Sequence, residues 1–530
     1  MTRSPILVLV LASATACAEP ERAPPPDTSD PVAEVSLFDL SDQLADGRTT
    51  SVAATQAYID RIEALDGDLN SVILVAPDAL EQAAASDARR AAGTPLGPLD
   101  GVPILLKDNV DAVGMPTTAG SWALEENFPA RDAEVTRRLR AAGVVILGKA
   151  NLSQFAGFRN TAAFNGSTVG GGPRNPYDLT RSAAGSSSGS GVATAMSFAA
   201  ATIGTETAGS IVGPSSVNGV VGMKPTIALV SRRGIVPISL NQDSSGPMTR
   251  TVRDAAMILD VIAGSDPEDP WSADADDNRT SYVAALDTAS LRGARLGVIR
   301  PTAPDARGVR RLLDDAIEVL EREGAEIVEI PAEELIDPRP EMRIVLLQDF
   351  KIDLNAYLAS TPETVPIRTL DELIAFSLVD PRERMHTMDY WEDAQATEGG
   401  RTDPTYQAAL RDGRRLTREE GIDRLLAEHG VDAVVSATSA PASEIEPDGT
   451  PRAGPIPPGP RGTRPPSLTV VAAVAGYPLI SVPMGLVDGL PVGITFAGTA
   501  WSEARLIGLA YDYEQASRAR VPPARALTGG

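Results

Sequence analysis

Apolar residues near residue 35 recur at the spacing of an α-helix. Leu37, Leu40 and Leu44 lie three or four positions apart, and Gly47 ends the pattern. Residues at that spacing share one face of a helix, so the pattern predicts a first amphipathic helix. Thr50 or Ser51 can cap a second helix. Its apolar face would consist of Val52, Ala53, Tyr58, Ile59, Ile62 and Leu65.

The following segments alternate between short apolar runs and amphipathic runs. Strands are expected at residues 70–76, 101–110 and 144–147, and helices at 79–92 and 131–142. Residues 242–248 are interpreted as a loop. Further strands are expected at 296–299, 326–330, 432–436, 479–482 and 492–496, with helices at 309–323 and 502–517. This alternation predicts an α/β protein with a mixed sheet.

The ends of the chain differ from this pattern. Residues 1–17 have a basic start, a short apolar run and small residues leading to Cys17, which is typical of a signal peptide and too short for a membrane span. The ending ATAC resembles a bacterial lipobox, so we expect an exported, periplasmic or cell-envelope protein that is lipid-anchored at Cys17. A plain secretory signal cut near Ala16 or Ala18 is the alternative. Residues 18–34 read as a disordered, Pro-rich tether and 521–530 as a tail.

Composition excludes several classes of partner and site. The net charge is −24, which argues against binding to nucleic acid or to anionic membrane surfaces. The single Cys forbids an intrachain disulfide and a Cys-based metal cluster. His386 and His429 are the only histidines, which weakens any His-based metal site. We therefore expect no metal and no cofactor, and membrane contact only through the N-terminal anchor.

Lysine is rare in this chain. Arg supplies nearly all the positive charge, and only four lysines are present: Lys107, Lys149, Lys224 and Lys351. A buried lysine can lose its proton, whereas an arginine cannot. Each lysine is thus a candidate for a role that Arg cannot fill, and chance retention at a packing-restricted position is the alternative. We interpret Lys149 and Lys224 as structural.

Residues 185–216 contain two Ser/Gly clusters that enclose a run of small apolar residues. Flexible linkers have no apolar neighbours to bury, so this stretch is unlike a linker. One hypothesis is that the two clusters fold together and present serine hydroxyls to a substrate. The alternative is a Ser/Gly-rich turn beside a buried Ala-rich helix.

Two familiar motifs are disfavoured. Residues 185–189 match G-x-S-x-G with Ser187 at the centre, but that motif requires a preceding strand and a following Asp and His. The preceding residues are polar, and His429 stands at an expected helix end. A Walker loop is excluded because Met223 and Pro225 flank Lys224.

A serine–lysine arrangement fits the chain better. A serine hydroxyl is a weak nucleophile near neutral pH and needs a base. With so few histidines, a neutral lysine is the best remaining base, and burial is what would depress its pKa. Lys107 stands at the end of an apolar strand, which suits that role.

Five motifs in order resemble the amidase signature family. They are VPILLKDN at 102–109, GVVILGKAN at 143–151, GSSSGSG at 185–191, GTETAGSI at 204–211 and GVVGMKPT at 219–226. The details look most like the bacterial peptide amidase branch. The resemblance implies a single large domain over residues 35–520, with a central mixed, twisted β-sheet flanked by helices on both sides.

The resemblance also implies roles for particular residues. Lys107 matches the family's base, and Ser210 matches its nucleophile. The family's bridging serine lies 24 residues before the nucleophile, which gives Ser186, preceded by a cis Gly185–Ser186 peptide. The oxyanion hole would use backbone N–H groups of Thr207, Ala208, Gly209 and Ser210.

Two positions depart from the family pattern. Ala208 replaces a Gly, or the Asp of the peptide amidase branch, which puts C-terminal peptide amide specificity in doubt. Val212 replaces an Arg or its equivalent and should make that side of the site apolar. Other nearby residues are expected to be structural, to support the site or to pack in the core: Gln242, Asp243, Phe155, Phe158 and Tyr390.

The expected function is hydrolysis of a carboxylic amide through a serine acyl-enzyme, releasing ammonia or an amine. The substrate would be a small-molecule or short-peptide amide. Two alternatives are an amidotransferase A-type subunit that passes ammonia to a tRNA-bound substrate, and an inactive binding scaffold. The signal peptide and the acidic charge argue against the first alternative, and the intact Lys107, Ser186 and Ser210 argue against the second. The sequence specifies no oligomeric state.

Overall fold

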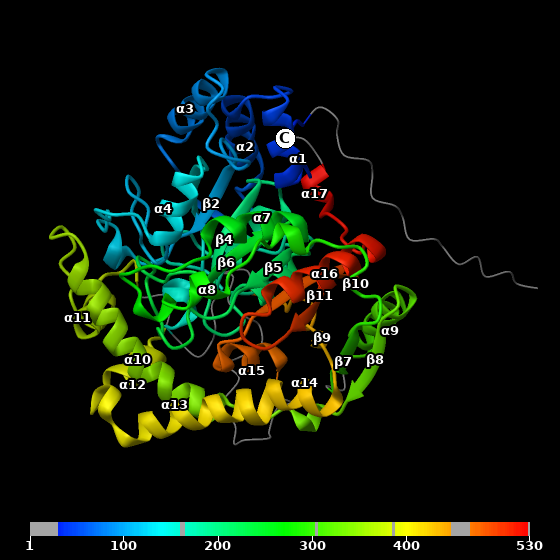
Figure 1. Ribbon diagram of the computed structural model, residues 1–530. Helices are drawn as coiled ribbons and strands as arrows, with labels where there is room; N and C mark the ends of the chain where they lie inside the picture. The colour runs from blue at the N-terminus through cyan, green and yellow to red at the C-terminus, as the bar shows by residue number, and fades with distance from the viewer. Residues whose placement is uncertain (1–29, 160–164, 303–305, 384–386, 447–466, 528–530) are drawn as a thin grey trace, which may run out of the picture.

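A computed structural model describes residues 30–159, 165–302, 306–383, 387–446 and 467–527. Within them, one eleven-stranded mixed sheet has the order β1-β3-β2-β4-β6-β5-β10-β11-β9-β7-β8 (Figure 1). The strands are β1 (Val72–Val75), β2 (Pro103–Lys107), β3 (Val145–Ala150), β4 (Ala201–Glu206), β5 (Val221–Lys224), β6 (Ser244–Thr249), β7 (Arg295–Ile299), β8 (Glu326–Ile330), β9 (Ala433–Ala437), β10 (Leu479–Val487) and β11 (Leu490–Ala497). The predicted α/β class with a mixed sheet is confirmed.

Helices cover both faces of the sheet, as expected. The α-helices of the first half are α1 (Leu37–Ala45), α2 (Ser51–Leu65), α3 (Ala79–Ala91), α4 (Glu134–Ala141), α5 (Ser188–Ala195), α6 (Val212–Val217), α7 (Val252–Ile262) and α8 (Ala275–Asn278). Those of the second half are α9 (Arg307–Arg322), α10 (Arg339–Ser360), α11 (Leu370–Val379), α12 (Asp389–Gln395), α13 (Pro404–Thr417), α14 (Asp423–His429), α15 (Leu468–Ala475), α16 (Glu503–Ser517) and α17 (Ala524–Leu527).

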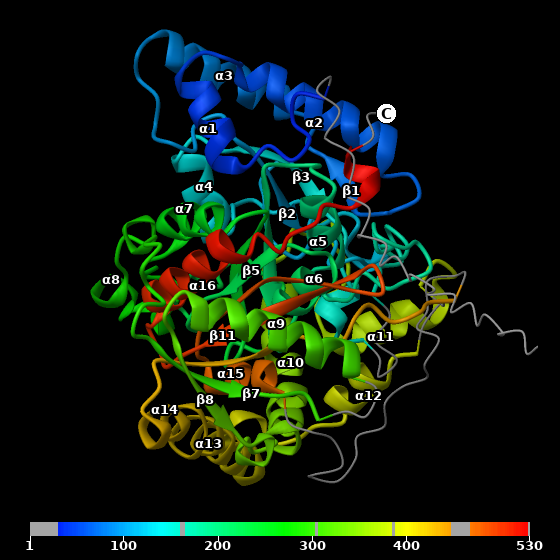
Figure 2. The same ribbon diagram turned by 90° about the vertical axis from the view of Figure 1, so that its right-hand side faces the viewer.

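Strand β10 shows how the two faces are divided. Leu479 packs in a core with residues of α6, α14 and α15, whereas its neighbour Ile480 packs in the large core with residues of α7, α9 and α16. Successive side chains of a strand point to opposite faces, so these helices form two layers. Figure 2 shows α16 and α9 on the near side of β11.

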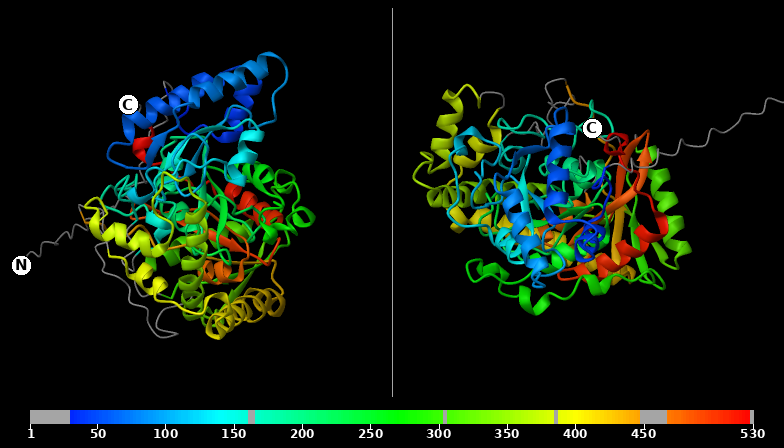
Figure 3. Two further views of the ribbon diagram at one scale, coloured as in Figure 1. Left: turned by 90° about the vertical axis from the view of Figure 1, so that its left-hand side faces the viewer. Right: turned by 90° about the horizontal axis from the view of Figure 1, so that it is seen from above.

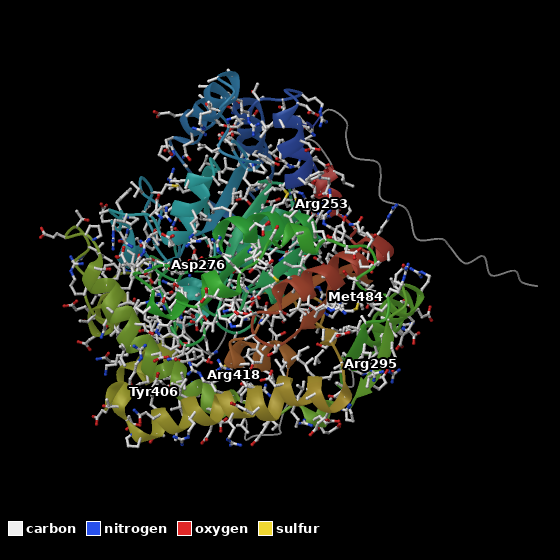
Figure 4. The ribbon with its side chains drawn as sticks, viewed as in Figure 1. Arg253, Asp276, Arg295, Tyr406, Arg418 and Met484 are labelled. Carbon is white, nitrogen blue, oxygen red and sulfur yellow. The ribbon has the colours of Figure 1, made fainter. Side chains whose placement is uncertain are left out.

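The molecule has distinct ends. Helices α1 to α3 lie at one end, and the segment α13–α14 lies at the opposite end (Figure 3). Tyr406 in α13 and Arg418 just after it lie along this second segment, which passes beside α15 (Figure 4).

Of the two residues expected to cap the second helix, Thr50 caps α2, because its side chain accepts a hydrogen bond from the N–H of Ala53.

One expected loop is a central strand. Residues 244–249 form β6, which pairs antiparallel with both β4 and β5. The segment carries Ser, Gly and Pro rather than alternating apolar residues, so it lacks the period of two by which a strand is predicted from sequence. Pro247 lies opposite Ile203, and Gly246 lets β6 approach β5 closely, since a Cβ there would lie 2.0 Å from the Met223 carbonyl oxygen.

Both expected chain-end boundaries need correction. The end of the expected tether packs onto the domain, where Val32 is buried and Glu34 forms an ion pair with Arg520. The expected tail contains the short helix α17, whose Ala526 is buried and accepts a hydrogen bond from Arg61. The buried side chains of Val32 and Ala526, together with the contacts of Arg61 and Arg520, therefore hold both ends against the domain.

The predicted signal peptide and lipobox lie outside the described residues. Among the residues that are described, no helix combines the length and the apolar character that crossing a membrane requires.

Candidate active site

Lys107 ends strand β2 inside the sheet. Strand β4 runs parallel to β2 as its neighbour, so the carboxyl ends of the two strands meet at one edge. The Lys107 ammonium nitrogen Nζ lies 2.7 Å from Ser186 Oγ, 2.9 Å from Thr205 Oγ1 and 3.1 Å from the Thr205 carbonyl oxygen. The side chain is 0% exposed. Its surroundings are hydroxyl and carbonyl oxygens rather than a hydrogen-bonded carboxylate.

Burial sets the protonation of Lys107. Removal from water disfavours the charged ammonium and lowers the pKa of Lys107 to about 7, against the opposing negative charges of Asp243 and Glu206. Near neutral pH a large share of the amine is therefore unprotonated. Such an amine can accept a proton from the serine hydroxyl beside it.

Ser186 belongs to the first Ser/Gly cluster. The Gly185–Ser186 peptide is cis, as the resemblance implies. The Ser186 side chain is buried, and its carbonyl oxygen accepts a hydrogen bond from the Ser153 N–H at 2.9 Å. A Cβ at Gly185 would lie 2.3 Å from Ser153 Oγ, so only glycine fits beside this contact.

Ser187, the centre of the G-x-S-x-G match, has a structural role. Its hydroxyl donates to the Thr205 carbonyl oxygen at 3.1 Å and accepts from the Thr205 N–H at 3.3 Å. The residue is fully buried at the start of α5. His429 pairs with Glu334 at a helix end instead, 3.1 Å apart. These contacts agree with setting the lipase-type interpretation aside.

Ser210 lies in the short connection between β4 and α6. The Ser187 N–H donates to the Ser210 carbonyl oxygen at 3.1 Å, which joins the two Ser/Gly clusters directly. The residue is half-buried. Within the described residues, neither the Ser210 hydroxyl nor the N–H groups of Ala208, Gly209 and Ser210 have a hydrogen-bond partner. The structure thus brings Lys107 onto Ser186 and joins the Ser210 backbone to the same cluster, without a direct Ser186–Ser210 hydroxyl contact.

Glu206, the last residue of β4, holds the far end of the connection between β4 and α6 through backbone hydrogen bonds. Its Oε2 accepts hydrogen bonds from the N–H of Ile211 at 2.7 Å and of Val212 at 3.0 Å. Gly209 has φ +90°, a conformation that residues with a side chain rarely adopt. The Val212 side chain is fully buried in the core beneath α15. The expectation that Val212 faces the site is therefore wrong, because its side chain packs in that core and has no exposed surface.

Asp243 contacts Thr207, the first residue of the connection between β4 and α6. Its carboxylate accepts hydrogen bonds from the Thr207 hydroxyl at 2.6 Å and from the N–H groups of Ile238 and Ser239 at 2.8 and 2.9 Å. Burial raises the pKa of Asp243 to about 7, although these three donors act in the opposite direction. The supporting role expected for Asp243 agrees with these contacts.

Sequence reasoning passed over Thr205. Its side-chain oxygen contacts Lys107 and also accepts a hydrogen bond from the Asn109 side chain at 3.0 Å. No local signal marked Thr205, because its contact with Lys107 depends on the parallel pairing of β2 with β4, and no strand was predicted at residues 201–206. A small cavity adjoins these groups and is lined by Asn109, Ala156, Thr205, Thr207, Arg232, Ile235, Val236, Ile238, Asp243 and Ser244.

The other lysines do not contact the serines. Lys149 forms a buried ion pair with Asp108 at 2.8 Å, and Lys224 donates to the Pro225 carbonyl oxygen at 3.0 Å. Lys351 donates to backbone carbonyl oxygens of Gln395 and Thr397. In the described part of the chain, no group of three or more His, Cys, Asp and Glu side chains could hold a metal ion.

The aromatic residues considered for a substrate pocket pack against one another. Phe155 meets Trp391 edge to face with ring centroids 5.1 Å apart, and Phe158 stacks on Tyr390 at 4.9 Å. Phe155 and Phe158 are buried in a core of their own with residues of α10 to α12. Core packing accounts for them.

Comparison with known proteins identifies the family of this chain. The family model described as Amidase matches residues 53–507. A probable amidase of Arabidopsis thaliana is 38% identical over 509 residues, covering 93% of this chain and 92% of the relative. The A-type subunit of the glutamyl-tRNA(Gln) amidotransferase of Salinispora tropica is 35% identical, covering 92% of this chain and 98% of the relative.

A solved structure agrees with this placement. The native peptide amidase from Stenotrophomonas maltophilia superimposes with a TM-score of 0.86 and 45% sequence identity, covering 93% of this chain and 99% of the amidase. The chain belongs to the amidase signature family and is an amide-hydrolysing enzyme.

Proposed function

We propose that this enzyme hydrolyses carboxylic amides through an acyl-enzyme on Ser210, with Ser186 as a proton relay and Lys107 as the base. The observation that carries the proposal is the buried 2.7 Å contact between Lys107 Nζ and Ser186 Oγ, in the cluster whose backbone bonds to Ser210. A lysine with a pKa of about 7 can act as a base near neutral pH.

The reaction has two halves. Neutral Lys107 takes the proton of Ser186 while Ser186 takes that of Ser210, and Ser210 Oγ attacks the amide carbonyl carbon. The C–N bond then breaks, and ammonia or an amine leaves with the proton returned through Ser186. A water molecule next attacks the ester carbonyl, gives its proton to the same relay and releases the acid. Ser210 regains its hydrogen, so the enzyme is unchanged.

Backbone donors stabilise the negative charge that forms on the carbonyl oxygen. We assign this role to the N–H groups of Thr207, Ala208, Gly209 and Ser210. Three of these, at residues 208–210, have no partner within the described residues, which supports the assignment. Removal of one such donor typically costs on the order of 3 kcal/mol in transition-state free energy.

Short-peptide amides are the first substrates to test. The support is the 45% identity to a peptide amidase, together with a solved complex of a peptide amidase, 44% identical to this chain, with the competitive inhibitor chymostatin. Ala208 lacks the carboxylate that the peptide amidase branch carries at this position. We therefore propose a broader range of leaving groups, to be measured with peptide amides, aliphatic amides and aryl amides.

An amidotransferase A-type subunit is the second candidate, because such subunits are among the relatives. The two functions differ in what they need. The proposed hydrolase acts on a peptide amide alone, whereas the A-type subunit needs partner subunits and a tRNA-bound substrate. Steady hydrolysis of peptide amides by the pure chain would favour the first function, and its absence would favour the second.

Replacement of the nucleophile tests the chemistry. Ser210→Ala should abolish amide hydrolysis while leaving thermal unfolding close to that of the wild type, because Ser210 is half-buried and its hydroxyl makes no hydrogen bond within the described residues. Equal rates in Ser210→Ala and the wild type would refute the acyl-enzyme. Mass spectrometry of the wild type with a slowly hydrolysed ester should show the acyl group on Ser210.

Export and lipid anchoring at Cys17 form a separate proposal. The support is the sequence ATAC at residues 14–17, which contains the only cysteine of the chain. Expression of the full chain in bacteria should place it in the membrane fraction, and Cys17→Ala should abolish lipid labelling. Unlabelled wild-type protein would refute the anchor.

A further inference from the structure

Thr207 is held on two sides by a neighbouring loop, residues 238–243. Its hydroxyl donates to Asp243, and its carbonyl oxygen accepts a hydrogen bond from Gln242 Nε2 at 3.2 Å. The Gln242 side chain is buried, with 4% exposed. Thr207 thus cannot rotate without breaking a contact to this loop.

The loop is itself fixed. The N–H groups of Gln242 and Asp243 both donate to the Ser239 carbonyl oxygen, at 3.0 and 2.8 Å. The Asp243 carboxylate in turn accepts the N–H groups of Ile238 and Ser239. Gln242 therefore holds the Thr207 carbonyl from a rigid support.

Peptide geometry transmits this contact to the next residue. Among the described residues only the Gly185–Ser186 peptide is cis, so the Thr207–Ala208 peptide is trans. In a trans peptide the carbonyl oxygen and the following N–H point in opposite directions. With the Thr207 carbonyl directed at buried Gln242, the Ala208 N–H points the other way, where Ala208 is half-buried and its N–H lacks a partner within the described residues.

We infer that Gln242 is a positioning residue of the oxyanion hole, which aims the Ala208 N–H at the substrate carbonyl by holding the Thr207 carbonyl oxygen. The inference rests on the proposed acyl-enzyme function and adds a residue to it. The buried Gln242 side chain acts through the Thr207 carbonyl oxygen, so its loss should weaken stabilisation of the transition state and leave substrate binding nearly unchanged.

Gln242→Leu is the direct test, because leucine has a similar volume and no donor. We expect kcat for peptide amides to fall about 10- to 100-fold and KM to change by less than about 3-fold, since deletion of a whole donor costs about 100- to 1,000-fold. A peptide aldehyde, which adds Ser210 Oγ to form a tetrahedral hemiacetal, should lose affinity by the same factor as kcat/KM. The matching peptide alcohol, which cannot form that adduct, should keep its affinity.

Asn241→Leu is the matched control. Asn241 and Gln242 both line a second small cavity, separate from the one beside Thr205. The Asn241 side chain, however, bonds to Asp349, Tyr406 and Arg414 rather than to residues 207–210. This variant should lose thermal stability and show the same ratio of aldehyde to alcohol affinity as the wild type. Gln242→Glu keeps the shape of glutamine, and its ionised form cannot donate, so its kcat should drop further below that of the wild type as pH rises.

Three results would overturn the inference. They are a wild-type kcat in Gln242→Leu, equal losses of aldehyde and alcohol affinity, or the same change of this ratio in Asn241→Leu. Ser210→Ala separates this failure from failure of the proposed function. An inactive Ser210→Ala beside a fully active Gln242→Leu would refute only the role of Gln242, whereas an active Ser210→Ala would refute the acyl-enzyme.

Discussion

Lys107 Nζ and Ser186 Oγ lie 2.7 Å apart in a fully buried part of the protein, at the edge where β2 and β4 end together. The two residues are 79 positions apart in the chain. Parallel pairing of β2 with β4 brings Lys107 close to Thr205, and the Ser187–Thr205 contacts then place Ser186 beside the amine. The proposed base and relay are thus products of sheet topology.

Replacement of Lys107 should separate its chemical role from its structural one. Lys107→Met removes a buried amine at similar volume, and Lys107→Arg supplies a cation that cannot lose its proton. We expect both variants to lose amide hydrolysis by at least about 100-fold, in line with the loss of a general base. Activity assays with thermal unfolding of the methionine variant test this, and substantial activity in the arginine variant would exclude Lys107 as the base.

The activity of the wild type should rise with pH around neutrality. The proposed base must be unprotonated to act, and the pKa of Lys107 is lowered to about 7. The value of kcat/KM should therefore increase tenfold per pH unit well below 7 and level off above it. Measurement of kcat/KM from pH 5 to 9 tests this, and a flat profile across pH 7 would contradict the assignment.

A substitution that removes the charge of Glu206 should shift the pH dependence of kcat/KM. The Glu206 charge raises the pKa of Lys107, so Glu206→Gln should lower it and shift the rising limb to lower pH. The amide oxygen of Gln can still accept the N–H groups of Ile211 and Val212, because one carboxylate oxygen holds both in the wild type. Glu503→Gln is the control, since Glu503 lies beside Lys224 and Thr226. If the rising limb of kcat/KM stayed in place or moved to higher pH in Glu206→Gln, the Glu206 charge would not be what raises the pKa of Lys107.

Much of this site could be predicted from sequence, because its residues occur in ordered motifs. The motifs named Lys107, Ser186 and Ser210, and the apolar run before Lys107 predicted its burial. They did not name Thr205 as the second contact of the amine, because that contact depends on which strands are neighbours. Strand order is a property of the whole sheet and has no local signal.

Strands β4, β5 and β6 were not predicted, and β6 was expected to be a loop. Residues 244–249 carry no alternation of apolar and polar residues, because both faces of β6 are buried and its neighbours approach closely. Strands buried on both faces lose the period of two that marks half-exposed strands. Val212 was misplaced for a related reason. Its side chain packs in the core with residues of α14 and α15, and residue type alone does not show whether an apolar side chain faces the core or the site.

Lys149 should affect stability rather than chemistry. It pairs with Asp108 in the interior, and both side chains are 1% exposed. Lys149→Met leaves the Asp108 charge buried without its partner, which should lower the free energy of unfolding by about 3–5 kcal/mol. Urea unfolding measures this loss. The double variant Asp108→Asn with Lys149→Met should recover part of the loss, and a single variant as stable as the wild type would show that the pair contributes little.

Gly209 should be required for the geometry of the oxyanion hole. Its φ of +90° strains any residue with a side chain, and a Cβ there would lie 3.3 Å from Thr469 Cγ2 in α15. Gly209→Ala should therefore shift the N–H donors and lower kcat by about 10- to 100-fold, with a smaller effect on KM. Gly213→Ala is the matched control, because a Cβ there meets nothing within 4 Å and φ is ordinary. If Gly209→Ala retained the wild-type kcat, the backbone of residues 208–210 would not be the group that stabilises the oxyanion.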